Sequence, residues 1–87
     1  MEDFEQLINA IKYALEEMES YRIDYAVAEA DRCRCPVSLV DGVYDELSNK
    51  MNEWAEFEDL PEDFWYDEFD DEDVVYIAYD IIHEQDE

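Results

Sequence analysis

Negative charge dominates this chain and limits what it can fold into. The 87 residues include 28 Asp and Glu against 5 Lys and Arg, which gives a formal net charge of −23. A net charge of about 2–8 in magnitude already keeps a small domain in solution, and a much larger one destabilises the compact state by self-repulsion. We therefore expect modest stability at low salt and a role for the charge beyond solubility.

Hydrophobic residues nevertheless favour a folded chain over a disordered acidic tail. They make up 48% of the sequence, and 15% of the residues are aromatic, whereas disordered acidic segments are poor in aromatic residues. At this length we predict one domain over residues 1–87, with a small core.

Amphipathic spacing predicts an all-α bundle of about four to five helices. Apolar residues recur at intervals of three and four over 3–19, from Ser38 to about Glu56, and from about 71 to 82. Ser38 and Asp41 resemble a capping box that starts the second of these stretches, although Gly42 then costs about 1 kcal/mol in its first turn. Pro61, followed by two acidic residues, is typical of the first turn of another short helix.

Two short segments leave the fold class open. Apolar residues alternate from Tyr21 to Val27 as in a half-buried strand, but from Ile23 to Ala30 they also follow helical spacing. The Ala-rich run favours a helix, because Ala is the strongest helix former. A strand near 21–34, or near 74–82 where β-branched residues cluster, would make the fold α+β instead.

The same spacing predicts the core. Five large side chains on these helices are expected to be buried: Leu7, Ile11, Leu47, Trp54 and Ile81. Phe64, Trp65 and Phe69 are expected to pack inward from the segment before the last helix.

The sequence predicts no enzyme, no cofactor and no dedicated metal site. Cys33, Cys35 and His83 are the only soft ligands, and a structural zinc site needs four Cys or His. The acidic run 67–73 has neither the glycine nor the spacing of an EF-hand loop. A single His and no phosphate-binding glycine loop exclude the common catalytic motifs. Two carboxylates could act as in glycosidases, but so short a chain leaves little room for a substrate pocket.

The expected location is the cytoplasm. Cys33 and Cys35 are too close for an easy disulfide and too few for a disulfide framework, which favours a reducing compartment. The first residues, MEDFEQ, lack the basic start of a secretory signal. No apolar run approaches the roughly 18 residues of a membrane span, so no membrane contact is expected.

One stretch, Glu53–Asp73, concentrates the charge. It interleaves twelve carboxylates with large apolar rings, and no Lys or Arg follows Lys50. Because helical residues four apart lie about 5–6 Å from each other, such carboxylates can approximate a row of phosphates. At about one charge per 1.7 Å, 23 charges correspond to roughly 40 Å of duplex DNA. The predicted partner-binding residues are Glu53, Glu56, Glu58, Asp59, Glu62, Asp63, Asp67, Glu68, Asp70, Asp71, Glu72 and Asp73.

The run EDFWYDEFDD at 62–71 resembles the small acidic DNA-mimic proteins of phages and mobile elements. These include anti-restriction proteins and several anti-CRISPR proteins, and the resemblance is one of size, charge and alternating rings and carboxylates. It implies an inhibitor that occupies the DNA- or RNA-binding site of a host defence enzyme. The sequence is compatible with a monomer or a homodimer, and a symmetric dimer would extend the charged surface. Trp65 and Tyr66, if exposed, would anchor such a partner. Core packing is the expected role for Trp65 and an equal alternative for Tyr66.

Two alternatives to mimicry remain. An acidic adaptor or chaperone could shield a basic cellular protein without imitating nucleic acid, and a small domain could simply tolerate its charge. Both a mimic and an adaptor would bind a basic protein, and the chain itself would bind no nucleic acid. Only a mimic must be displaced from its partner by nucleic acid.

Overall fold

Four α-helices and one short 3₁₀ helix form the fold. The computed structural model describes residues 2–85, so residues 1, 86 and 87 of the predicted domain lie outside the described part. The elements are α1 (Glu2–Glu17), α2 (Tyr21–Cys33), η1 (Val37–Leu39), α3 (Val43–Phe57) and α4 (Asp71–Gln85). Residues 2–85 contain no strand, and both ambiguous segments are helical. The all-α prediction is confirmed.

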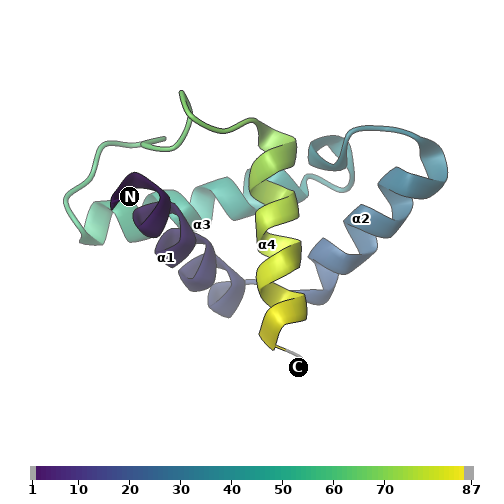
Figure 1. Cartoon of the computed structure of the whole chain (residues 1–87), viewed down its shortest axis with the longest axis horizontal. Coiled ribbons are helices and arrows are strands. Elements are labelled where there is room, and N and C mark those ends of the chain that lie inside the picture. The colour runs from purple at the N-terminus through teal and green to yellow at the C-terminus, as the bar shows by residue number, and fades with distance from the viewer. Residues whose placement is uncertain (1, 86–87) are drawn as a thin grey trace.

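The helices pack around α4, which crosses the middle of the molecule with α1 on one side and α2 on the other (Figure 1). α4 contacts α1, α2, α3 and η1, while α1 packs mainly on α3. Apolar side chains from all four helices, with Trp65 from the segment before α4, meet in one core. No polar or charged side chain in the described part is buried, so the core contains no carboxylate that would need a partner.

The predicted core is confirmed at four of five positions. Leu7, Ile11, Leu47 and Ile81 are buried. The prediction for Trp54 is wrong, because this ring is only half-buried at the edge of the core. It lies beside Phe64 of the turns that follow α3, with the ring centroids 6.0 Å apart and the ring planes tilted by 43°.

α3 begins later than the sequence predicted. Ser38 lies in η1, and no side chain caps α3, so the predicted capping box is wrong. The helix starts at Val43, after Gly42, whose φ of 63° lies in the left-handed region. Glycine adopts this conformation without a Cβ penalty, so Gly42 belongs to the turn before the helix and does not weaken its first turn.

The predicted short helix after Pro61 is also wrong, because residues 58–70 form turns and irregular backbone without a helix. α3 ends at Phe57, and Asp59, two residues later, is left-handed (φ 58°). The amide of Leu60 donates to the carbonyl of Ala55 at 2.8 Å, as in a Schellman motif. Asp63 is left-handed as well (φ 57°), which interrupts any helix between Pro61 and α4. Asp is among the few residues that tolerate this conformation.

Candidate acidic binding surface

The acidic stretch Glu53–Asp73 covers the end of α3, the turns after it and the start of α4 (Figure 1). All twelve of its carboxylate side chains are exposed. The structure thus places every residue of the predicted site on the surface, along one continuous segment of the chain. We call this segment the acidic surface.

Three aromatic rings hold the turns of the acidic surface against the helices. Trp65 is only 1% exposed, and its Nε1 donates to the Tyr44 hydroxyl at 3.2 Å. Phe64 meets Trp65 edge to face, with the ring centroids 5.1 Å apart. Phe69 lies beside Phe4 of α1, with the centroids 6.1 Å apart. The predicted inward packing is confirmed for these residues, whereas Tyr66 is 65% exposed.

A reciprocal hydrogen-bonded pair fixes the turn at Asp63 onto α3. The side-chain amide of Asn52 donates to Asp63 Oδ1 at 3.2 Å, and the backbone amide of Asp63 donates to Asn52 Oδ1 at 3.0 Å. Sequence reasoning missed Asn52, because nothing in the spacing links it to a residue eleven positions later. Asp63 therefore has a structural task in addition to its charge.

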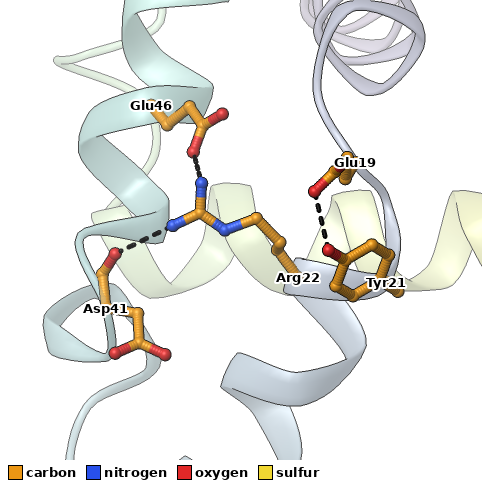
Figure 2. Close-up of polar contacts among 5 residues, drawn as sticks. All are labelled: Glu19, Tyr21, Arg22, Asp41 and Glu46. Atoms are coloured by element: carbon orange, nitrogen blue, oxygen red, sulfur yellow. Dashed lines mark hydrogen bonds and ion pairs between the residues drawn. The ribbon is translucent and has the colours of Figure 1, made fainter.

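Three of the five Lys and Arg side chains form ion pairs within the molecule. Arg22 pairs with Glu46 (Figure 2), Arg32 with Glu29 at 2.6 Å, and Lys50 with Glu53 at 3.6 Å. The hydrogen bonds from Arg32 lower the pKa of Glu29, so that carboxylate stays ionised. Within residues 2–85, Lys50 is the only Lys or Arg that pairs with the acidic surface, at its first residue. Apart from Asp63, which accepts from Asn52, the other carboxylates of this surface are exposed to solvent and open to a partner.

None of the soft ligands Cys33, Cys35 and His83 belongs to the acidic surface. Cys33 is exposed and Cys35 half-buried, both as free thiols. His83 Nε2 lies 3.1 Å from Asp24 Oδ1, which links α4 to α2. Among the described residues, no three Cys, His, Asp or Glu side chains converge as metal ligands. No described helix is long and apolar enough to cross a bilayer.

The acidic surface can offer a partner many ionised oxygen acceptors on a fixed backbone. Carboxylates pair with Arg and Lys through charge-assisted hydrogen bonds, which are about twice as strong as neutral ones. The molecule that carries them measures 38 × 28 × 23 Å. Comparison with protein-family models, with curated proteins and with solved structures returns no match, so the function of this surface must be argued from its own charge and geometry.

Proposed function

We propose that the protein is a nucleic-acid mimic that inhibits a host defence enzyme, of the restriction or CRISPR type, by occupying its basic DNA- or RNA-binding site. One observation carries the proposal. The chain has a net charge of −23 and a longest dimension of 38 Å. Duplex DNA, at one charge per 1.7 Å, carries about 22 charges over that length. The protein and a duplex of equal length therefore present nearly the same total charge.

The anchoring of the acidic surface also supports the proposal. Trp65 and the Asn52–Asp63 pair hold its turns in place before any partner binds. A surface that is already ordered loses less conformational entropy on binding, which leaves more of the interaction energy as affinity. Pairing with Lys and Arg would also release bound counterions, as in DNA binding. A disordered acidic tail of equal charge would lack the first advantage.

Cleavage kinetics test the proposal. The protein is added to a panel of restriction and CRISPR nucleases, and cleavage rates are measured over a range of DNA concentrations. For its target we expect the KM for DNA to rise with little change in kcat, because the inhibitor and DNA compete for one site. Inhibition that excess DNA does not relieve would contradict mimicry. A basic partner that nucleic acid cannot displace would favour the acidic adaptor instead.

A further inference from the structure

A pocket of about 340 Å³ lies away from the acidic surface, between the α1–α2 turn and the start of α3. We call it the tyrosine pocket. Its lining residues are Glu19, Tyr21, Arg22, Tyr25, Asp41 and Val43. Figure 2 shows Arg22 reaching from α2 toward α3, with Tyr21 and Glu19 on its other side.

Two exposed tyrosines form the aromatic wall of this pocket. Tyr21 is 65% and Tyr25 is 53% exposed. They are four residues apart on α2, and side chains at that spacing are neighbours on a helix surface. The Tyr21 hydroxyl donates to Glu19 Oε2 at 2.7 Å, which fixes the ring at the pocket edge (Figure 2). The face of a tyrosine ring attracts cations through its quadrupole.

The charges around the tyrosine pocket favour a cation despite the presence of Arg22. Its guanidinium pairs with Glu46 and donates to the backbone carbonyl of Asp41 at 3.3 Å. The carboxylate of Asp41 points away from this guanidinium (Figure 2). Together with Glu19 and Glu46, this carboxylate makes three negative charges around the pocket against the one positive charge of Arg22. Glu19 also keeps acceptor capacity, since a carboxylate has about four lone-pair sites.

We propose that the tyrosine pocket binds an arginine side chain of the basic partner. The class of partner rests on the proposed function, whereas the chemistry of the pocket does not. A guanidinium is planar, stacks on aromatic faces and donates to carboxylates in a fork, which the point charge of a lysine does not match. The guanidinium would stack on Tyr21 and Tyr25 and donate to Glu19, and the charge of the Asp41 carboxylate would add to the attraction. Such an anchor would orient a partner that the acidic surface holds by diffuse charge.

Titration of the ¹⁵N-labelled protein with a capped Gly-Arg-Gly peptide, at about 0.15 M salt to screen diffuse attraction, tests this inference. The neutral Gly-citrulline-Gly peptide is the matched probe. We expect saturable amide shifts around Tyr21, Tyr25 and Val43, with the citrulline peptide at least tenfold weaker. Shifts confined to the acidic surface, or equal binding of the two peptides, would overturn the inference.

Variants distinguish peptide binding in the tyrosine pocket from general electrostatic attraction. Tyr25→Leu should weaken binding of the arginine peptide at least fivefold, while Tyr66→Leu, at an even more exposed ring outside the pocket, should not. Asp41→Asn removes a pocket charge and keeps a residue that tolerates its φ of 55°, so it tests the same site if Tyr25→Leu does not fold. Wild-type affinity in a folded Tyr25→Leu or Asp41→Asn protein would overturn the inference.

The inference about the pocket and the proposed function can be contradicted independently. If the arginine peptide binds the tyrosine pocket but no nuclease is inhibited in competition with DNA, only the proposed function is wrong. If a nuclease is inhibited in competition with DNA but the peptide does not bind, only the pocket is wrong.

Discussion

At the scale of single residues, the backbone is left-handed at several positions that apolar spacing does not distinguish from their neighbours. Among the described residues, φ is positive at Arg34, Asp41, Gly42, Asp59 and Asp63, and only one of these is glycine. A left-handed conformation costs a non-glycine residue roughly 1–2 kcal/mol. The fold therefore contains local strain that a glycine would relieve.

Asp59→Gly is expected to stabilise the protein by about 0.5–1 kcal/mol. Glycine is the preferred residue at this position of a Schellman motif. Glycine loses more conformational entropy on folding than Asp does, but this cost offsets only part of the relieved strain. The change also removes a carboxylate from the negative end of the helix dipole. Urea denaturation measures the effect. The matched control is Glu58→Gly, which removes the same charge at a φ of −91°. An equal change in the free energy of unfolding for both variants would contradict the strain at Asp59.

Tyr44 should make stability fall at alkaline pH. Desolvation raises the pKa of this half-buried phenol, and the nearby Asp71 raises it further. A pKa raised by folding gives stability that is complete below the ordinary value of 10.0 and is lost as the pH rises through the folded value.

Tyr44→Phe should therefore flatten the decline in melting temperature above about pH 10. Tyr13, Tyr21 and Tyr76 also have raised pKa values, so part of the decline should remain. At neutral pH the variant should lose about 1–3 kcal/mol, because the Trp65 Nε1–H loses its acceptor. An unchanged alkaline slope in melts between pH 8 and 11 would contradict the role of Tyr44.

At the scale of elements, apolar spacing was sufficient wherever a helix buries one continuous face. It predicted α1 and α4. For α2 the spacing was ambiguous and the Ala-rich run favoured the helix, whose buried face is the stripe from Ile23 to Ala30. It failed at the start of α3 and after Pro61. Gly42 and Asp63 have left-handed backbones there, and the contact that holds Asp63 comes from Asn52 on another element. Spacing does not encode such tertiary contacts.

Trp65 is expected to hold the acidic surface onto the helices. Trp65→Ala should cost about 3–5 kcal/mol, because it leaves a cavity under the turns. Trp54→Ala is the matched control and should cost less, since that ring is only half-buried. Urea denaturation gives both values, and amide hydrogen exchange should show faster opening around residues 61–69 in Trp65→Ala. Equal costs for the two variants would show that Trp65 is not the anchor.

At the scale of the whole molecule, the sequence predicted the acidic surface but not the tyrosine pocket. Carboxylates are costly to bury without partners, so exposure of all twelve follows from composition and from a stretch that itself contains no Lys or Arg. The tyrosine pocket joins residues from Glu19 to Val43. It exists only because the α1–α2 turn packs beside the start of α3, and no local pattern indicates that contact.

Added salt should raise the melting temperature. At 0.01 M salt the Debye length of about 30 Å spans most of the molecule, and at 0.1 M it is about 10 Å. Screening therefore relieves repulsion among distant carboxylates. The surface ion pairs of Arg22, Arg32 and Lys50 weaken as well, but each contributes only about 0–1 kcal/mol. A melting temperature that falls steadily with salt in thermal melts would contradict net repulsion.

The central claim is that a partner binds the acidic surface through many distributed charges. Two fourfold variants test it, and each changes the net charge from −23 to −19. The first carries Glu56→Gln, Glu62→Gln, Asp67→Asn and Glu68→Gln. The matched control carries Glu5→Gln, Glu16→Gln, Glu84→Gln and Asp31→Asn, at exposed positions outside the acidic surface. Asp63 is left unchanged because it holds the turn through Asn52.

The decisive measurement is the affinity of the proposed target nuclease for the wild type and both variants at two salt concentrations. Exposed ion pairs contribute about 0.2–1 kcal/mol each, so the first variant should lose roughly fourfold or more in affinity and the control much less. Wild-type affinity should also fall steeply with salt, since each contact depends on screened charge. Equal losses in both variants, or an affinity indifferent to salt, would contradict the account and move the binding site away from the acidic surface.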